Sequence, residues 1–476
     1  MEKIKGLHEL PYLILDGGNL LFKEESLSAG LLQQAAITAQ GIIDSYNAMY
    51  YDAVAVGRND LTGGLSFLQQ QAARTKFAWL SANLVNKSTG KSLFPAYLVR
   101  KVGSISIGII GLTGYDGSDR FLGKEDAALL SWQKVLPDLV AELAAQCDLL
   151  ILLSNNELKQ NQEIAESFPD IHLIIQSTPR SKNFPPQLHN KTLIAQTGKQ
   201  GKYLGWMLVN WQKSKTWGRA GAAKELATKK QELDGLNGRI GRIERREKKE
   251  DLRENPGYQK LLVSRDQLLS EIIFLENEIF DLKKTGQAPS TFENHFIDLD
   301  INLPDQPEVK QIVEATKLKV NKAGRNQADT SATSETLNEL ELEKLSFTGW
   351  MTCALCHFPQ TEFWKTTDHF SAFQTLTEQE QQFNLNCLPC HVTSQYKDIK
   401  ISNNETLLLS LPVQLLQVGC EICHGPGKNH AVSQTPSDIS RKPDMTICIR
   451  CHTSERDEDF NYYNDIERIA CPASKK

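Results

Sequence analysis

Residues Val418–His430 read VGCEICHGPGKNH and hold two cysteines and two histidines. Cys420 and Cys423 are three residues apart, and His424 follows directly, which is the pattern C-x-x-C-H. Two thiols on one helical turn can each form a thioether to a vinyl group of haem, and the histidine that follows can then ligate the iron. The stretch therefore predicts a site for covalently bound haem c.

The same pattern occurs four times in the C-terminal quarter of the chain. The predicted thioether cysteines are Cys353, Cys356, Cys387, Cys390, Cys420, Cys423, Cys448 and Cys451, and the predicted proximal histidines are His357, His391, His424 and His452. A zinc ribbon or a set of disulfide loops also uses paired cysteines, but neither needs a histidine after every pair. We therefore expect four covalent haem c groups, with zinc or disulfides as the alternative.

Few histidines remain to ligate the irons from the other side. His369 and His430 lie within the same region. Gly-Pro-Gly turns the chain between His424 and His430, which favours a neighbouring haem as the target of His430. A solvated surface position is the alternative for both histidines. The axial positions left over could be filled by the upstream residue His295, by Met351 or Met445, by a partner protein, or by nothing.

The region from residue 347 to about 460 resembles the tetrahaem cytochrome c fold of small electron shuttles associated with hydroxylamine oxidation. The resemblance rests on FTGWMTCALCH, FWKTTDHFSAF, LNCLPCHVTS, VGCEICHGPGKNH and ICIRCHT. It implies a mainly α, haem-packed domain over residues 347–476, with the haems in stacked pairs. It also implies that His430 binds the haem anchored at His357, that His369 serves the third or fourth haem, and that at least one haem keeps an open position.

Residues 1–217 alternate apolar runs with amphipathic stretches. Runs such as SISIGIIGLTG, DLLILLS and IHLIIQS indicate strands buried on both faces, so helices should cover both sides of a sheet in an α/β layered domain. The order of YLILDGGNLLF, YDAVAVGRND, FAWLSANLV and LIAQTGKQGKYLGWMLV resembles the metallophosphoesterase domain of the 5′-nucleotidase family.

The metal-binding positions that this resemblance implies are largely substituted. Such enzymes use two metal ions to activate water and to neutralise a phosphoryl group. Asp16 keeps the family residue, whereas Asn19, Arg58, Asn59, Asn155, Thr178 and Arg180 stand where the family has Asp, Asn or His ligands, and the usual first strand is missing. Arginine cannot ligate a divalent metal. We therefore expect a non-catalytic scaffold without a dinuclear metal site, and the alternative is a residual hydrolase acting on phosphate or sulfur esters.

Residues 218–286 show apolar residues at spacings of three and four, interrupted by the turn signal Asn255-Pro256-Gly257. This pattern predicts an antiparallel, coiled-coil-like helical hairpin. Such an arm suggests self-association or another partner, and the alternative is a solvated brace. Residues 287–322 should form a closing strand and helix, and the polar composition of residues 323–346 predicts a flexible linker.

The overall charge and hydropathy exclude two classes of protein. The 476 residues carry a net charge of −5, which gives no footprint for nucleic acid, and no apolar run is long enough to span a bilayer. Because haem c is attached outside the cytoplasm, we expect a periplasmic or extracellular protein. The N-terminus has no signal peptide, so we expect the start to be truncated. Cys147 should be a buried apolar residue, whereas Cys471 could remain a thiol or pair between chains.

These features together predict a multihaem electron-transfer protein whose partners are other cytochromes or an oxidoreductase. The alternative within redox chemistry is an enzyme that acts on a small inorganic substrate at an open haem. The alternative from another class is the ester hydrolase, with the haem region as its accessory.

Overall fold

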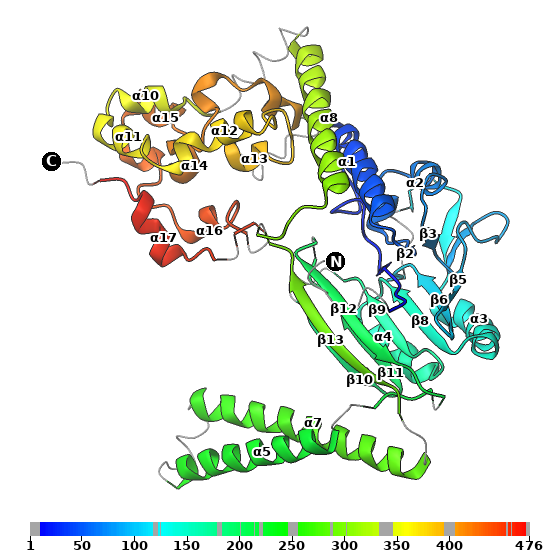
Figure 1. Cartoon of the computed structure of the whole chain (residues 1–476). Helices are drawn as coiled ribbons and strands as arrows, with labels where there is room; N and C mark the ends of the chain where they lie inside the picture. Colours follow the sequence, from blue (N-terminus) through cyan, green and yellow to red (C-terminus); the bar gives the residue numbers. More distant parts are fainter. Residues whose placement is uncertain are drawn as a thin grey trace.

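The computed structural model describes residues 10–117, 122–123, 125–178, 183–199, 201–213, 215–218, 222–245, 256–285, 289–300, 302–332, 346–394, 405–453, 456–457 and 459–472. These residues form an α/β body, a two-helix arm and a C-terminal helical module (Figure 1). The predicted α/β layered body, the helical hairpin and the mainly helical C-terminal region are therefore present among these residues.

The main sheet of the α/β body has six strands in the order β10-β11-β9-β8-β6-β5. Its strands are β5 (Tyr97–Val102), β6 (Ile105–Leu112), β8 (Leu149–Ser154), β9 (Leu173–Gln176), β10 (Phe184–His189) and β11 (Thr192–Gln196). The four inner strands run parallel, and β5 and β10 pair antiparallel at the two edges. All six residues of β8 are buried, as expected for a parallel strand covered on both faces.

A smaller parallel sheet consists of β1 (Leu15–Asp16), β2 (Ala53–Ala55) and β3 (Ala78–Leu80). Strands β4 (Leu84–Asn86) and β7 (Ala127–Leu129) form a separate antiparallel pair. The helices of this body are α1 (Ala29–Ala48), η2 (Asn59–Leu61), α2 (Leu65–Ala72), α3 (Trp132–Gln146) and α4 (Leu158–Ser167). Cys147 is buried in the core beside α3, as its apolar surroundings in the sequence predict.

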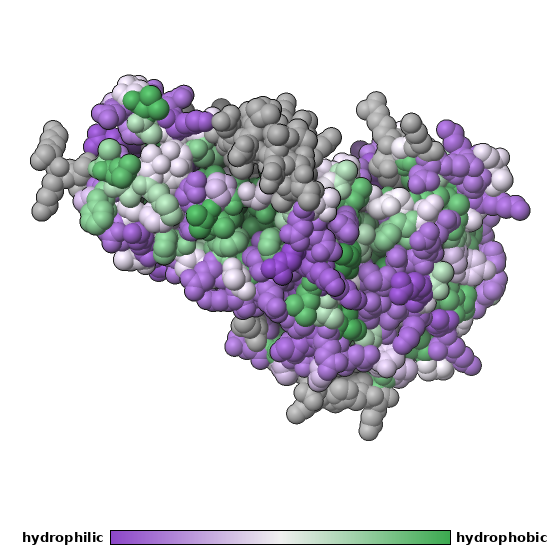
Figure 2. Space-filling view, turned by 90° about the horizontal axis from the view of Figure 1, so that it is seen from above, coloured by the Kyte–Doolittle hydropathy of each residue, from purple (hydrophilic) through white to green (hydrophobic). Residues whose placement is uncertain are grey.

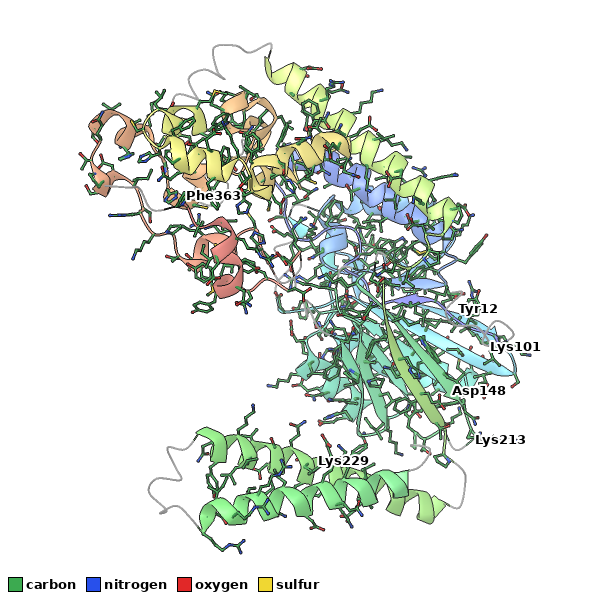
Figure 3. All side chains as sticks on the ribbon, turned by 60° about the vertical axis from the view of Figure 1, so that its left-hand side comes forward. Tyr12, Lys101, Asp148, Lys213, Lys229 and Phe363 are labelled. Atoms are coloured by element: carbon green, nitrogen blue, oxygen red, sulfur yellow. The ribbon has the colours of Figure 1, made fainter. Side chains whose placement is uncertain are left out.

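The arm is an insertion between two adjacent strands. Strands β12 (Tyr203–Asn210) and β13 (Thr291–Asp298) pair antiparallel, and the chain between them forms α5 (Ala222–Glu244) and α7 (Pro256–Thr285). Lys229 binds Glu271 at 2.8 Å near one end of the hairpin, and Tyr258 donates to Glu244 near the other, so the helices run antiparallel. Figure 3 shows Lys229 on this arm, which stands apart from the crowded side chains of the body and the module.

Helix α8 (Pro307–Ala332) corrects the predicted linker. It continues ten residues into the stretch predicted to be flexible, and residues 333–345 lie outside the described residues. Polar composition misleads here because part of the helix packs against the body and the module. Ala323 is buried, and Gln327 donates to the carbonyl of Gly30 on α1 at 3.1 Å.

The C-terminal module is built from short helices and turns. They are α10 (Trp350–Ala354), α11 (Phe358–Trp364), α12 (Asp368–Glu378), α13 (Leu388–His391), η4 (Glu405–Ser410), η5 (Val413–Leu415), α14 (Cys420–His424), α15 (Lys428–Ser433), η6 (Pro436–Asp438), α16 (Met445–Cys448) and α17 (Tyr462–Ile469). Within the described part of the chain, no helix is apolar enough over sufficient length to cross a membrane.

The module is docked on α1 and α8 through buried polar contacts. Gln34 of α1 is 1% exposed; its amide donates to the carbonyl of Phe383 at 2.9 Å and accepts from the N–H of Leu385 at 2.9 Å. A side chain at Gly324 would meet the Phe383 carbonyl oxygen at 2.0 Å from its Cβ. The two backbones therefore touch, and the module and the α/β body pack as one piece.

Candidate functional site

Each C-x-x-C-H motif lies on a short helical turn of the module. In the first anchor the N–H of His357 donates to the carbonyl of Cys353 at 2.9 Å, and in the fourth His452 donates to Cys448 at the same distance. One helical turn therefore places the histidine of these anchors directly beyond the first cysteine of its pair. The structure forms no disulfide among the eight anchor cysteines, all of which lie in the described residues.

Four of the candidate ligand histidines have a ring nitrogen held by an acceptor. The Nδ1 atoms of His391, His424 and His430 bond to backbone carbonyl oxygens, at 2.6, 2.7 and 3.0 Å, whereas Nδ1 of His452 bonds to the carboxylate of Asp457 at 2.7 Å. A donor hydrogen on Nδ1 leaves the lone pair of Nε2 for a metal and fixes the ring. These side chains are therefore oriented as iron ligands.

Two pairs of histidine rings lie close together. The ring centroids of His357 and His430 lie 6.2 Å apart with planes 20° from parallel, and those of His369 and His452 lie 6.1 Å apart with planes tilted by 55°. Two metal–imidazole bonds of about 2 Å each, together with the distance from each nitrogen to its ring centre, add up to about 6 Å. One iron between each pair fits this separation.

The pKa of His369 also suits ligation. Burial lowers this pKa, and the neighbouring His452 lowers it further. The imidazole is therefore neutral near pH 7, and only the neutral ring has a lone pair for iron.

Apolar side chains reach the surface around the anchors. Figure 2 shows green patches over the helical module among polar atoms. The exposed apolar residues of the module include Met351, Leu355, Phe358, Val413, Val432, Met445, Ile449 and Tyr463. Leu355 stands between the cysteines of the first anchor and is 83% exposed. A porphyrin is a large apolar ring, so side chains of this kind at these positions fit a haem-packed module.

The anchors lie next to one another in a definite order. The side chains of Cys353 and Cys420 share a hydrogen bond, so the first anchor touches the third. Helices α14 and α16 are in contact, which brings the third anchor to the fourth. The carbonyl that holds His391 is that of Ala372 on α12, the helix that carries His369. The order of contacts is thus first, third, fourth and second.

Of the additional ligands proposed from the sequence, His295 lies in the α/β body, whereas Met351 and Met445 lie on the anchor helices α10 and α16. The ring of His295, on β13, stacks on Trp206 of β12 at 4.5 Å. Met351 and Met445 are about half exposed on the module surface. Among the described residues, no histidine ring faces His391 or His424 in the way that His430 faces His357.

The substituted metallophosphoesterase positions converge at the carboxyl ends of β1, β2 and β8. Asn19 Oδ1 accepts the N–H of Asn59 at 3.1 Å, Asn59 donates to the carbonyl of Lys23 at 3.0 Å, and Asn155 donates to the carbonyl of Gly17. Thr178 donates to Gln196 at 2.7 Å, and Arg180 lies outside the described residues. The positions that the structure describes are therefore engaged in contacts within the protein.

Arg58 brings a positive charge to this edge. Its guanidinium bonds to Glu25 at 2.9 Å and to Asp116 at 2.5 Å. A fixed guanidinium repels a divalent cation, and it occupies two carboxylates that could otherwise bind one. Throughout the described residues, no group of three or more His, Cys, Asp or Glu side chains is placed to hold a metal ion.

Asp16, which is half-buried, and Asp60, which is buried, both serve the fold here. Asp16 accepts from Tyr46 at 2.8 Å and from the N–H of Gly18 at 2.8 Å, and burial raises its pKa. Asp60 accepts four backbone N–H groups, including those of Gly57 and Leu21, while burial raises its pKa to about 7. Both carboxylates thus bind the turns that follow β1 and β2.

Sequence reasoning missed two acidic residues of the haem region. Glu421 stands between the cysteines of the third anchor and is 3% exposed, and Asp457 holds His452. Glu421 could have been noticed in the sequence, because it is a carboxylate between apolar neighbours inside an anchor. Asp457 follows His452 by five residues, and only the folded turn brings their side chains together.

Both the C-terminal module and the α/β body are similar to known proteins. Residues 352–425 match the family of cytochrome c554 and c-prime. The match makes this part of the module similar to c-type cytochromes and implies haem c as its cofactor. The matched residues include the first three anchors of the cytochrome domain.

The α/β body is similar to 5′-nucleotidases. The chain is 36% identical to protein UshA of Salmonella pullorum over 100 residues, which are 21% of this chain and 18% of that protein. It is 26% identical to the 5′-nucleotidase of Vibrio cholerae over 229 residues, 40% of each chain. The chain thus spans less than half the length of these relatives. The body is 5′-nucleotidase-like, and the cytochrome domain is joined to it.

Solved structures show weaker similarity. The sulfate thiohydrolase SoxB of Thermus thermophilus is 23% identical with a TM-score of 0.36, covering 42% of this chain and 36% of that one. A 5′-nucleotidase precursor from the same species is 21% identical with a TM-score of 0.36, covering 44% of each chain.

Proposed function

We propose that this chain is an extracytoplasmic multihaem cytochrome that relays electrons through four covalently attached haems. The observation that carries the proposal is the presence of two pairs of neighbouring histidine rings, 6.2 and 6.1 Å apart, each of which includes the histidine of one anchor. His357, His391, His424 and His452 hold the irons on one side, and His430 and His369 complete two of the sites. Haem c supplies one-electron chemistry when bound.

The order of the anchors supports a relay over a single catalytic haem. The first anchor touches the third through Cys353 and Cys420, and the third touches the fourth through α14 and α16. The second anchor joins the fourth through α12. A continuous series of neighbouring cofactors can carry electrons from one end of the module to the other, and a redox partner at each end completes the function.

Haem counting tests the proposal directly. Protein matured with the haem-attachment machinery should give four haems per chain in a pyridine haemochrome assay, and mass spectrometry should find all four attached covalently. Stepwise reduction should then show more than one midpoint potential, because the four histidines have different partners. Two or fewer haems in fully matured protein would contradict the four-haem assignment.

A redox enzyme acting at an open haem is the second candidate. It is favoured by His391 and His424, which have no facing histidine ring among the described residues. An iron with an empty position binds small ligands. Carbon monoxide binding to the reduced protein, followed by turnover of a small inorganic substrate, would favour this candidate over a simple relay.

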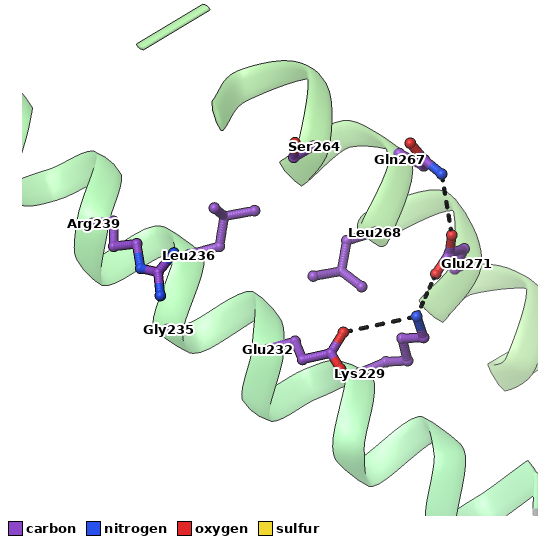
Figure 4. A pocket seen from close by; sticks show the side chains of 9 residues that line it. All are labelled: Lys229, Glu232, Gly235, Leu236, Arg239, Ser264, Gln267, Leu268 and Glu271. Carbon is purple, nitrogen blue, oxygen red and sulfur yellow. Dashed lines mark hydrogen bonds and ion pairs between the residues drawn. The ribbon is translucent and has the colours of Figure 1, made fainter. Parts of the chain in front are cut away.

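The 5′-nucleotidase-like body is proposed to be a scaffold without hydrolase activity. This proposal is supported by the ion pairs of Arg58 and by the amide side chains at the strand ends. The arm, whose two helices are joined by ion pairs such as Lys229–Glu271, is proposed to serve self-association or a partner. A shallow groove of about 470 Å³ lies between its helices, where Leu236 and Leu268 face each other (Figure 4).

A further inference from the structure

Glu421 is a buried carboxylate at the junction of three segments of the cytochrome domain. It is the second residue of the third anchor and is 3% exposed. Its Oε1 accepts the N–H groups of Thr348 at 2.8 Å and Gly427 at 2.7 Å, and its Oε2 accepts that of Gly349 at 2.8 Å. Glutamate is rarely buried so completely, so this position needs a physical reason.

The donors belong to the segments that carry the first-haem ligands. Gly349 is the N-cap of α10, which contains Cys353, and Gly427 is the N-cap of α15, which contains His430. The φ angle of Gly349 is +84°, and a Cβ there would lie 2.4 Å from Gln414, so its backbone is fixed from both sides. The carboxylate thereby holds the start of the first anchor and the helix of His430 against the third anchor.

The carboxylate also places a negative charge near two cofactor sites. Neutral backbone amides are the three hydrogen-bond donors that the structure shows for it. A charge in a buried environment acts more strongly than the same charge in water. Its neighbours Cys353 and Cys420 share a hydrogen bond, so the charge lies close to both the first and the third anchor.

We propose that Glu421 is a positioning residue that sets the reduction potentials of the first and third haems and holds His430 opposite His357. Oxidised iron carries one more positive charge than reduced iron. A buried anion nearby therefore favours the oxidised state and lowers the potential. This inference rests on the proposed four-haem function. It names a residue that gives the first and third haems reduction potentials different from those of the second and fourth.

The test is a potentiometric titration of purified holoprotein, followed by visible and electron paramagnetic resonance spectra. Glu421→Gln keeps the shape and removes the charge, so two of the four midpoint potentials should shift to more positive values while the other two stay in place. Glu378→Gln is the matched control, because Glu378 is an exposed residue of the same domain whose carboxylate accepts from Gln374 at 2.8 Å. This control removes the same charge at a solvent-exposed position, so it should move the midpoint potentials much less.

A third variant separates charge from positioning. Glu421→Asp keeps the charge on a shorter side chain, so the potential of the third haem should stay near its wild-type value. A high-spin signal should grow at the first haem as His430 loses its alignment, and the potential of that haem should shift with its ligation. Potentials in Glu421→Gln that move no more than in Glu378→Gln would overturn the proposal. Failure of both Glu421 variants to yield holoprotein would also overturn it, because the residue would then serve folding alone. Fewer than four haems in the wild type would instead contradict the proposed function, before any variant is compared.

Discussion

His357 and His430 face each other with ring centroids 6.2 Å apart and planes 20° from parallel, although they belong to the first anchor and to the helix after the third. Gly425 and Gly427 lie between His424 and His430, and Gly425 has a φ of +89°, which a residue with a side chain rarely adopts. The turn thus directs His430 away from its own anchor. This contact between two anchors supports an assembly of interdependent haem sites.

Replacing His430 should change one haem without removing it. His430→Ala should convert one low-spin haem to high spin and create carbon monoxide binding at that site, because the iron loses its second axial ligand. The haem should stay attached, because the thioethers of Cys353 and Cys356 do not depend on that ligand. Electron paramagnetic resonance of the oxidised protein would measure the change. Val432→Ala, at an 85% exposed position of the same helix, should leave the spectrum unaltered. An unchanged low-spin spectrum in His430→Ala would show that the ligand is another residue.

Asp457 should make the fourth haem electron-rich. Its carboxylate holds Nδ1 of His452 at 2.7 Å, whereas backbone carbonyls hold His391 and His424. An anionic acceptor makes a ligand histidine more basic, which favours oxidised iron. Asp457→Asn should therefore raise one midpoint potential in a redox titration, and Asp459→Asn at an exposed neighbouring position should leave it nearly constant. A drop in that potential would refute the argument.

The strand ends of the α/β body should not bind a metal pair. Asp16→Asn should leave phosphoester hydrolysis at background level in the presence of Mn²⁺ or Zn²⁺, as in the wild type. It should lower the free energy of unfolding by about 1–3 kcal/mol, because asparagine keeps only one acceptor oxygen for the two donors, Tyr46 and the N–H of Gly18. Metal analysis and a generic phosphoesterase assay, beside a denaturant titration, measure these outcomes. Two tightly held ions per chain, with activity lost in Asp16→Asn, would reverse the scaffold assignment.

His172 should make the α/β body sensitive to acid. Its Nδ1 accepts the N–H of Leu150 at 3.0 Å, and burial lowers its pKa from 6.5 to about 4. The folded state therefore binds the proton less readily than the unfolded chain. Stability from this group is complete above pH 6.5 and is lost as the pH falls toward 4, by about 3 kcal/mol at most.

His172→Asn offers the test, because its amide oxygen can still accept from Leu150 and has no proton to gain. Urea unfolding of wild type and variant at several pH values between about 7.5 and 4.5 should give a difference in stability that narrows as the pH falls. His189→Gln, at a partly exposed site beside Glu166, serves as the control. A difference that is constant with pH would show that His172 does not titrate in this range.

Gln34 should couple the cytochrome domain to the body. Gln34→Ala leaves the Phe383 carbonyl and the Leu385 N–H without their buried partner, which should cost about 1–3 kcal/mol. We expect the haem spectrum and the far-ultraviolet circular dichroism to lose their common thermal transition. Gln33→Ala, on the exposed side of the same helix, should preserve it. Identical transitions in both variants would argue against the coupling.

Regular patterns in the sequence predicted much of this architecture. The apolar run of Leu149–Ser154 indicated a buried strand, and the spacing of Leu268, Ile272 and Leu275 indicated a helix with one apolar side, and the structure agrees with both. The anchors are local motifs, so five residues are enough to identify each one. Local sequence patterns were therefore sufficient to predict these secondary-structure elements and haem c as the cofactor.

What escaped prediction depends on contacts between distant residues. The end of α8 carries a linker-like composition, yet Gly324 and Gln327 pack against segments far away in the sequence. The role of Glu421 appears only when Thr348 and Gly349 arrive from the first anchor. Residue composition cannot report such long-range neighbours.

The contact between Gly324 and the carbonyl of Phe383 has a consequence for the proposed electron relay. Even one methyl group would not fit at this seam, so the cytochrome domain keeps one orientation against α8 and the body. A redox partner of the proposed relay would therefore dock on a domain that does not swing on a tether.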